Sequence, residues 1–252
     1  NIPVTTALLL AAGTGSRLHP LTDDAPKCLS EVSGVAILER LVDNLRGHGF
    51  KRLVVVVGYL DQCIRDFLQE WEGELEIEYV VNPRYATTNN LYSLWLARAA
   101  IHEPFLLVES DVVFDTALLD RMVQPNRIAI ASMQEWMDGT TVTVDRSQQV
   151  SAFQIGDCAA PDEVCHKTVN MYSFTMESWA GVSQRLSDHV TAGHVKNYYE
   201  TVFAEMIADG SLAMEAVSFD SGRWYEIDTL KDLHEAELIF PGEAAGEVLS
   251  SC

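Results

Sequence analysis

The sequence predicts an α/β fold in which helices flank a Rossmann-like, mostly parallel mixed sheet, with a small β-rich part in the second half. Strand and helix candidates alternate through the first half, as βαβ units require. Some of these strands are continuous apolar runs, which is typical of strands buried on both faces, and the first ends in a glycine-containing turn. We predict strands over residues 6–11, 53–58, 75–79 and 105–108, and helices over 37–48, 61–71 and about 89–100.

The first strand candidate leads into a loop of small residues. The apolar run Leu8–Ala12 continues into the segment from Ala11 through Ser16, whose small side chains let backbone N–H groups approach an anion closely. Arg17 and Lys27 supply the positive charge that a triphosphate requires. The Rossmann fingerprint needs a third glycine where Leu18 stands, and the ending of a Walker A loop is absent from the sequence. The segment therefore predicts a nucleotide-phosphate loop of another kind.

The later strands of the first half place polar residues at one edge of the predicted sheet. Residues 53–58 contain four consecutive valines, and residues 75–79 alternate with period two. Gly13, Asn82 and Asp111 each follow a strand candidate. Because ligands bind at the carboxyl ends of strands in such sheets, we expect these three residues to share one site.

The second half predicts a different local structure. Residues 140–145 and 150–155 bracket a polar turn and predict a β-hairpin. The pattern Thr229 to Asp232 predicts the capped start of a final helix. Further elements are a strand near 168–174, a helix over about 196–208 and a strand over 213–219. We expect one domain of residues 1–252, with a nucleotide-binding half of about 1–125 and an acceptor-binding half of about 126–252 whose strands floor the acceptor pocket.

Composition narrows the class of protein. The 252 residues carry a formal net charge of −20, which argues against a nucleic-acid partner because phosphate backbones would be repelled. No apolar stretch approaches the length of a membrane span, and the N-terminus lacks the pattern of a signal peptide. We therefore expect a cytoplasmic protein without a membrane partner.

The cysteines are informative about disulfide bonds, and the first residue about fusion to other domains. The five cysteines are odd in number and scattered without a CxxC pair, so we interpret them as free thiols. The chain opens at Asn1 rather than at methionine, which leaves open a fused multidomain protein. A homodimer is left open as well. The cysteines are Cys28, Cys63, Cys158, Cys165 and Cys252.

Two aspartates are candidate ligands for Mg²⁺. Asp111 directly follows an apolar strand candidate, where a carboxylate at the sheet edge can bind the ion. Asp228 ends the segment Trp224–Asp228. An aspartate in that position is also a common N-cap of the helix that follows, so both interpretations of Asp228 stand.

Two segments resemble a known family. The segment LAAGTGSRLHPLTDDAPKCL at residues 10–29 resembles the signature of the sugar-phosphate nucleotidyltransferases. The segment NPRYATTNNLYSL at residues 82–94 resembles the phosphocholine and 2-aminoethylphosphonate cytidylyltransferases within that family. Val35-Ala36 departs from the Lys-Pro that is common there, at a position to which we assign no role. Further matches are PKCLSEVSG at 26–34, MDGTTV at 137–142, KTVNMYSF at 167–174, NYYETV at 197–202 and WYEID at 224–228.

The resemblance implies the nucleotidyltransferase fold and its chemistry. An acceptor phosphate or phosphonate oxygen attacks the α-phosphorus of CTP, and pyrophosphate leaves. Asp111 and Asp228 match the family's metal-binding aspartates, which implies Mg²⁺ as cofactor, while Arg17 and Lys27 grip the triphosphate. The resemblance also implies cytosine as the base, and Asn89 and Asn90 could equally cap a helix. The expected nucleotide-binding residues are Leu10, Ala11, Ala12, Gly13, Thr14, Gly15, Ser16, Tyr59, Thr88, Asn89 and Asn90.

Aromatic and acidic residues gather in the acceptor-binding half. Such groups attract a cation, which suits a small amine-bearing acceptor, 2-aminoethylphosphonate ahead of phosphocholine. Lys167 is a candidate for gripping the acceptor's phosphate or phosphonate. For each aromatic residue, packing in the core is an equal alternative. The expected acceptor-binding residues are Trp136, Asp138, Lys167, Tyr172, Trp224 and Glu226, with Tyr225 in the same group.

Two other functions stay open. One keeps the chemistry but joins a sugar or cyclitol phosphate to another nucleotide, although the segment at 82–94 speaks against it. The other is a non-catalytic nucleotide-sensing domain, which would be expected to have lost Lys27 or a metal-binding aspartate. Both kinds of residue are retained.

Overall fold

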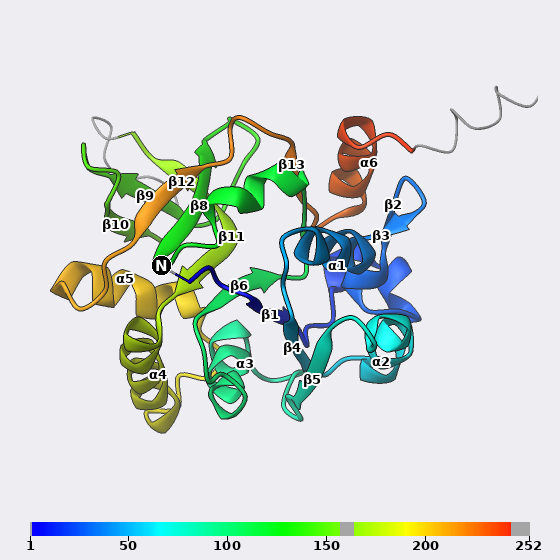
Figure 1. The fold of residues 1–252 in the computed structure, drawn as a ribbon, viewed down its shortest axis with the longest axis horizontal. Coiled ribbons are helices and arrows are strands. Elements are labelled where there is room, and N and C mark those ends of the chain that lie inside the picture. The colour runs from blue at the N-terminus through cyan, green and yellow to red at the C-terminus, as the bar shows by residue number, and fades with distance from the viewer. Residues whose placement is uncertain (1, 157–163, 243–252) are drawn as a thin grey trace, which may run out of the picture.

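The computed structural model describes residues 2–156 and 164–242 (Figure 1). Its centre is a nine-stranded sheet with the path β10-β9-β11-β6-β1-β4-β5, and β8 and β12 branch from β11. The first-half strands pair in parallel, as the alternation of strands and helices predicts. They are β1 (Thr6–Ala11), β4 (Arg52–Val57), β5 (Glu76–Val81) and β6 (Phe105–Glu109).

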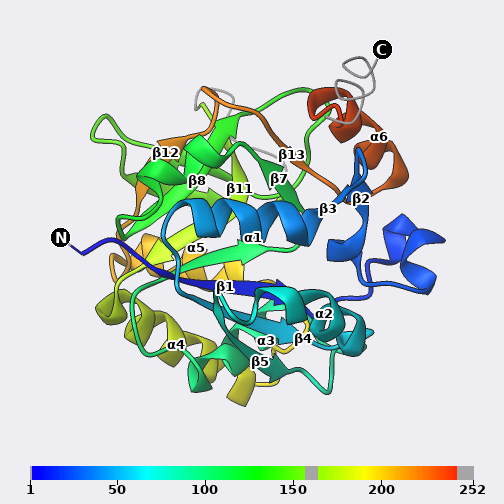
Figure 2. The ribbon, with the colours of Figure 1, turned by 45° about the vertical axis from the view of Figure 1, so that its right-hand side comes forward.

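Helices cover both faces of this sheet (Figure 2). Side chains of α1 (Ile37–Gly47) and α2 (Asp61–Leu68) pack with Leu9 and Val55 on one face. The alternate residues of the same strands face the other side. There they pack under α3 (Asn90–Leu96), α4 (Met176–Thr191) and α5 (Tyr199–Asp209). Burial on both faces explains why these strands are continuous apolar runs.

The second half extends the same sheet. The predicted hairpin is confirmed as β9 (Thr141–Val144) paired antiparallel with β10 (Val150–Gln154). The long strand β11 (His166–Phe174) lies antiparallel to β6, β8 and β9. Two further strands, β8 (Arg127–Ser132) and β12 (Glu215–Ser218), pair in parallel. The whole assembly is therefore a mixed sheet flanked by helices, which confirms the predicted fold class.

A smaller layer lies beside the phosphate-loop end of the sheet. β7 (Val112–Phe114) pairs antiparallel with β13 (Trp224–Glu226), so that Val112 faces Glu226. A short hairpin of β2 (Glu31–Val32) and β3 (Val35–Ala36) packs on the final helix α6 (Leu230–Ile239). Thr229 caps that helix in a full capping box with Asp232, as the sequence predicts. Pairing of β7 with β13 brings residues more than a hundred positions apart to the same place.

The sequence analysis missed two large elements, α4 and β8. Only Trp179, Val182 and Leu186 of α4 are buried, and the segment also contains Gly181 and three serines. This composition weakens both helix propensity and amphipathic pattern. The position of β8 in the interior of the mixed sheet depends on its pairing with β11 and β12, which lie far away in the sequence.

One prediction about the cysteines is wrong. Cys165 is disulfide-bonded rather than a free thiol. Cys28 and Cys63 are free, and burial raises the pKa of the Cys28 thiol to about 12, which leaves it unreactive. Cys158 and Cys252 lie outside the described residues.

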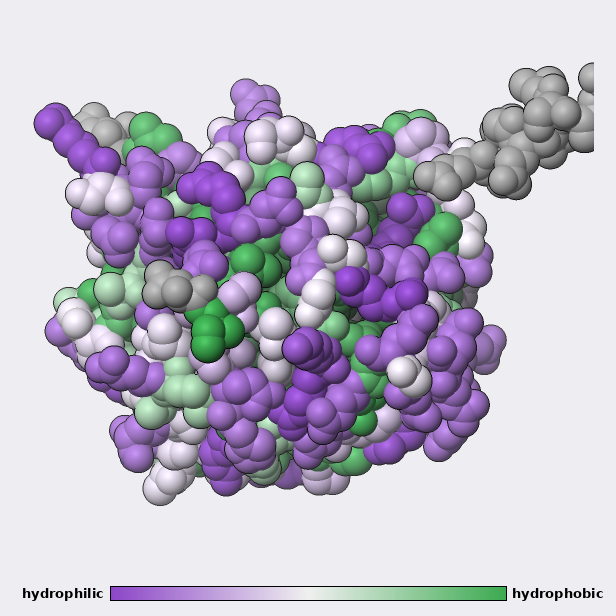
Figure 3. All heavy atoms as spheres, viewed as in Figure 1, coloured by the Kyte–Doolittle hydropathy of each residue, from purple (hydrophilic) through white to green (hydrophobic). Residues whose placement is uncertain are grey.

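The surface agrees with the strongly acidic composition. Hydrophilic side chains cover most of the face in Figure 3, and the apolar residues on it form small separated patches. None of the helices in residues 2–156 and 164–242 has the length and apolar character that crossing a membrane requires.

Candidate active site

A cavity of about 540 Å³ opens at the carboxyl ends of β1, β5 and β6. Gly13, Asn82 and Asp111 all line it, so the structure brings together the three residues that the sheet topology placed at one edge. Residues of the second half, including Lys167 and Glu226, complete the walls. The site therefore lies between the two halves of the chain.

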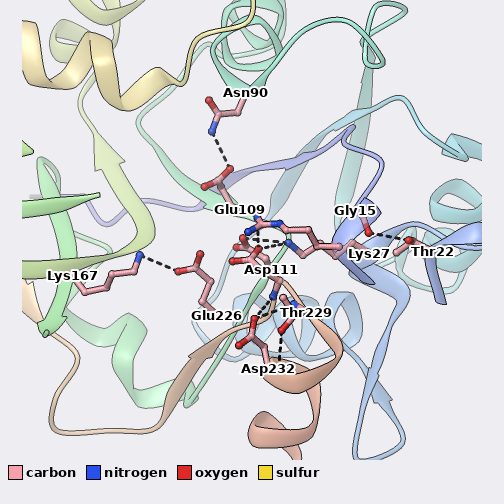
Figure 4. Close-up of polar contacts among 12 residues, drawn as sticks. Gly15, Thr22, Lys27, Asn90, Glu109, Asp111, Lys167, Glu226, Thr229 and Asp232 are labelled. Carbon is pink, nitrogen blue, oxygen red and sulfur yellow. Dashed lines mark hydrogen bonds and ion pairs between the residues drawn. The ribbon is translucent and has the colours of Figure 1, made fainter. Parts of the chain in front are cut away.

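The small-residue loop is held tightly against the segment that carries Lys27. Gly15 adopts a left-handed conformation with φ of 60°. A Cβ at Gly15 would lie 3.0 Å from Cβ of Lys27 and 3.1 Å from Cγ2 of Thr22, so both the backbone and the space require glycine there. The Thr22 hydroxyl donates to the Gly15 carbonyl at 2.9 Å (Figure 4). These contacts fix the loop beside the lysine.

Lys27 joins the two aspartates that the sequence analysis selected. Its Nζ lies 2.7 Å from Oδ1 of Asp228 and 3.6 Å from Oδ2 of Asp111, and Nη2 of Arg17 lies 3.3 Å from the same Asp228 oxygen. Burial lowers the pKa of Lys27, but the negative charges of Asp111 and Asp228 outweigh it, so the pKa is raised and the ammonium stays charged. Asp228 is not the cap of α6, because Thr229 has that role.

Three carboxylates form a group that could hold a divalent cation. Asp111, Glu226 and Asp228 each offer one oxygen, and these atoms lie within 4.8 Å of one another. Oδ1 of Asp111 is buried and has no hydrogen-bond partner among the described residues. Carboxylate oxygens are the donors that Mg²⁺ prefers, so this set fits such an ion. Burial, together with the charge of Asp111, raises the pKa of Glu226 to about 8, while Lys167 opposes the shift.

Lys167 holds the third of these carboxylates. Its Nζ lies 3.0 Å from Oε2 of Glu226 and donates to the Thr168 carbonyl at 3.0 Å. Only 6% of the Lys167 side chain is exposed. Figure 4 shows Lys167 and Glu226 pointing toward each other, to one side of the contact between Lys27 and Asp111.

Two further buried acidic residues, Glu109 and Glu200, line the same cavity. Asn90 donates to Oε1 of Glu109 at 3.4 Å and accepts from the backbone N–H of Tyr199 at 2.8 Å, which ties α3 to α5. Glu200, the next residue of α5, is 6% exposed, and its Oε2 has no partner among the described residues. Burial raises the pKa of Glu200 to about 7 and that of Glu109 well above its usual range. A cationic group in the cavity would satisfy both carboxylates.

The polar segment 82–94 builds the wall between these groups. Asn82 is buried and donates to the hydroxyls of Thr88 at 3.2 Å and Ser93 at 3.0 Å. Asn89 is the N-cap of α3, and its side chain accepts from the N–H of Asn90. Both Asn89 and Asn90 also line the cavity, so they combine a structural role with access to a ligand.

Most residues that the sequence analysis proposed reach the cavity. Those lining it come from the phosphate loop, the segment 82–94 and the second half. They are Leu10, Ala12, Gly13, Thr14, Gly15, Ser16, Arg17, Lys27, Thr88, Asn89, Asn90, Asp111, Asp138, Lys167, Glu226 and Asp228.

Two nucleotide-binding predictions do not reach the cavity. The side chain of Ala11 points into the core against α1 and α2, because successive residues of a strand face opposite sides. The hydroxyl of Tyr59 donates to the carbonyl of Thr22. Tyr59 therefore supports the phosphate-loop region from behind, beside a smaller hollow of about 260 Å³.

Three aromatic residues that were predicted to bind the acceptor do not line the cavity. Tyr172 is fully buried between Phe174, Tyr199 and Phe203. Trp224 packs against the core from the edge strand β13. Trp136 is 60% exposed and stacks on Tyr225 at 5.3 Å, outside the cavity. Packing in the core or on the surface accounts for each of them.

Several lining residues were not selected from the sequence. Glu109 precedes Asp111 by two positions at a strand end, which is a signal that could have identified it. Glu200 stands in NYYETV without any local pattern. Asn170 has φ of 58° inside β11, where the register with β8 shifts between Thr168 and Tyr172. Such a conformation is uncommon for a residue other than glycine and is typical of a β-bulge beside a site.

The first part of the chain, with the small-residue loop, Lys27 and Asp111, matches a known protein family. The family model described as the MobA-like NTP transferase domain matches residues 7–154. The chain belongs to this family. Within the MobA-like family, the matched residues cover the phosphate loop, Lys27 and Asp111, and the rest of the site comes from the remaining part of the chain.

Individual relatives and solved structures agree with this assignment. The chain is 33% identical over 246 residues to the CMP-5′-(3-aminopropyl)phosphonate synthase of Streptomyces rubellomurinus, with 93% of this chain and 38% of that protein covered. It is 25% identical to the CTP:phosphoglutamine cytidylyltransferase of Campylobacter jejuni, with 90% of this chain and 97% of that protein covered. The chain thus spans well under half of the first relative. In fold it is similar to the CTP:phosphocholine cytidylyltransferase LicC of Streptococcus pneumoniae, with a TM-score of 0.81 at 22% identity and coverage of 95% and 100%.

Proposed function

We propose that this nucleotidyltransferase is a Mg²⁺-dependent cytidylyltransferase that joins CMP from CTP to a small phosphonate or phosphate bearing a primary amine. The favoured acceptor is 2-aminoethylphosphonate. The observation that carries the proposal is one cavity lined by the small-residue loop 13–16, by the three clustered carboxylates Asp111, Glu226 and Asp228, and by two further buried carboxylates, Glu109 and Glu200. The named activities of the two relatives support it.

The residues suggest how the reaction proceeds. An oxygen of the acceptor's phosphonate or phosphate attacks the α-phosphorus of CTP and forms a new O–P bond. The bond between the α-phosphorus and the oxygen that bridges it to the β-phosphate breaks, and pyrophosphate leaves. The loop amides at residues 13–16, with Arg17 and Lys27, would hold the β- and γ-phosphates. Asp111, Glu226 and Asp228 would hold Mg²⁺, which supplies charge neutralisation at the phosphates when bound. Alignment and charge then provide most of the catalysis, without a protein nucleophile.

The lining of the cavity favours a primary amine over a trimethylammonium group. A primary ammonium donates three hydrogen bonds and suits the carboxylates of Glu109 and Glu200. A trimethylammonium group has no donor and is recognised by a box of aromatic faces. Tyr172, Trp224 and Trp136 lie outside the cavity and contribute to no such box there; among the described residues, the aromatic ones that line it are Tyr85 and Tyr198. In this proposal CTP lies against residues of about 1–125, and the acceptor contacts the second half together with Glu109.

The test is pyrophosphate release with Mg²⁺ across a grid of substrates. The four nucleoside triphosphates are each combined with 2-aminoethylphosphonate, 3-aminopropylphosphonate, phosphoethanolamine, phosphocholine and several sugar phosphates. We expect release only with CTP, and much faster with the primary amines than with phosphocholine. Release with a sugar phosphate and another nucleotide would replace the proposal, and silence with intact CTP binding would favour a nucleotide-sensing role.

A further inference from the structure

Each carboxylate of the candidate metal cluster is neutralised by a basic side chain of the chain itself. Lys27 and Arg17 both contact Oδ1 of Asp228, at 2.7 Å and 3.3 Å. Lys27 also reaches Oδ2 of Asp111 at 3.6 Å, and Lys167 contacts Glu226 at 3.0 Å. Each of the three carboxylates therefore already has a basic side chain of the chain itself as its partner.

We propose that Lys27 is the counterion of the metal cluster in the nucleotide-free protein, and that it moves to the triphosphate when the nucleotide binds. Because of this exchange, the cluster binds a cation weakly in the nucleotide-free protein and strongly in the nucleotide complex. The inference rests on the metal and triphosphate sites of the proposed function. It adds that Lys27 exchanges between two partners and so links the two binding events.

Lys27 competes with a metal ion for one oxygen of the cluster, Oδ1 of Asp228. A magnesium ion lies about 2.0–2.1 Å from its oxygen ligands. With Nζ of Lys27 already 2.7 Å from Oδ1 of Asp228, an ion bound to the same oxygen would lie next to the ammonium in a poorly hydrated place. Like charges at such a distance repel strongly. The lysine must therefore leave Asp228 before the ion binds well.

A destination for Lys27 lies next to it. Its Cβ packs against the position where Gly15 has no side chain, directly beside the loop residues 13–16, which line the cavity. A lysine is a point charge on a flexible four-carbon stem, so it can reach a phosphate on that loop by rotation about its side-chain bonds alone. Lys167 lacks this freedom, because it is 6% exposed and also bound to the Thr168 carbonyl. Lys27, rather than Lys167, is therefore the exchanging cation.

Positive coupling follows from this exchange. The triphosphate attracts Lys27 and frees Oδ1 of Asp228 for the ion, and the ion on the cluster displaces Lys27 toward the phosphates. By linkage, each ligand raises the affinity of the other by the same factor. Removal of the lysine charge should then expose the cluster to a cation even without nucleotide.

The experiment measures Mn²⁺ binding without nucleotide or acceptor, by the electron paramagnetic resonance signal of free Mn²⁺. Lys27→Met should bind Mn²⁺ at least tenfold more tightly than the unmodified chain. Lys27→Arg keeps the charge and should stay within about threefold of it. Lys51→Met is the matched control, because it removes the same charge from an exposed residue just before β4, at the opposite ends of the parallel strands. Circular dichroism confirms that each variant is folded.

The outcomes separate this inference from the proposed function. Equal Mn²⁺ affinity of Lys27→Met and the unmodified chain, or an equal gain in Lys51→Met, overturns the exchange while leaving the cytidylyltransferase proposal intact. A chain without pyrophosphate release can still show the tenfold gain, because the measurement needs no turnover. The absence of Mn²⁺ binding in all four proteins overturns the exchange together with the metal site on which it rests.

Discussion

The change Glu200→Gln tests the amine end of the cavity. Glu200 lies in the first turn of α5, where its buried carboxylate has an oxygen without a partner among the described residues. The substitution keeps the size and shape of the side chain and removes only the charge. It should therefore weaken the binding of the acceptor and leave the binding of CTP unchanged.

The expected size follows from the interaction lost. A hydrogen bond to a charged group contributes about 1.5–3 kcal/mol. At about 1.4 kcal/mol for each factor of ten, kcat/KM for 2-aminoethylphosphonate should fall about 10- to 150-fold. The KM for CTP should change by less than about twofold, because the proposed contacts of CTP are with the loop 13–16, Arg17 and Lys27 rather than with Glu200.

The assay is steady-state pyrophosphate release with each substrate varied in turn. Glu205→Gln is the matched control, since it lies on the same helix but contacts Arg185 and His189 at the surface. It should leave both constants unchanged. An unchanged kcat/KM for the acceptor in Glu200→Gln, or an equal loss for CTP and acceptor, would refute the assignment of Glu200 to the amine.

The same variant makes a prediction about stability and pH. Burial raises the pKa of Glu200 from 4.5 to about 7, so the folded protein binds more protons than the unfolded chain between these values. Ionisation of Glu200 therefore costs stability as the pH rises through this window, by about 3 kcal/mol at most above it. Glu200→Gln should be more stable than the unmodified chain in urea at pH 8, and this advantage should vanish near pH 4.5. An advantage that is independent of pH would contradict the burial argument.

Three further changes test the rest of the site. Asp111→Asn should lower kcat for pyrophosphate release by about two orders of magnitude while the circular dichroism spectrum stays unchanged, and activity close to normal would remove Asp111 from the metal cluster. Tyr172→Ala should lower the free energy of unfolding in urea by about 3–5 kcal/mol, whereas Trp136→Ala should lower it by about 1 kcal/mol. A raised KM for the acceptor in Tyr172→Ala, at unchanged stability, would show instead that Tyr172 contacts the acceptor. Gly58→Ala should raise the KM for CTP about tenfold, because the added Cβ would lie 2.7 Å from Cβ of Tyr85 and 3.0 Å from the Ala12 carbonyl oxygen. Unchanged kinetics would show that the loop after Ala12 adjusts without cost.

Much of the first half could be predicted from local sequence. β1 spans residues 6–11 as predicted, β4 is shifted by one residue at both ends, and β6 extends one residue further than predicted. These strands are buried on both faces and are separated by amphipathic helices, so each is marked by its own residues. The phosphate loop was recognisable for the same reason, since glycine and small residues must be contiguous to let a backbone approach an anion.

The second half could be predicted only in part. The hairpin of β9 and β10 and the cap of α6 depend on neighbouring residues, and both are confirmed. The faces of β11 depend instead on its partners, because it pairs with β9 at Lys167 and with β6 at Tyr172. The strand thus passes from the cavity into the core within a few residues. The residues next to one another in β11 do not show which of them face the cavity and which face the core.

The sequence by itself determined the fold class, the family and the position of the small-residue loop at the edge of the sheet. Those properties are encoded in contiguous patterns of apolar, small and basic residues, whose physical requirements are local. Only the tertiary structure decided the composition of the acidic end, where Glu109 from β6 meets Glu200 from α5. It also decided that Lys27 rests on Asp228, since the pairing of β7 with β13 brings that aspartate beside Asp111. These contacts join residues about 90 to 200 positions apart, and such proximity arises from the packing of the chain as a whole.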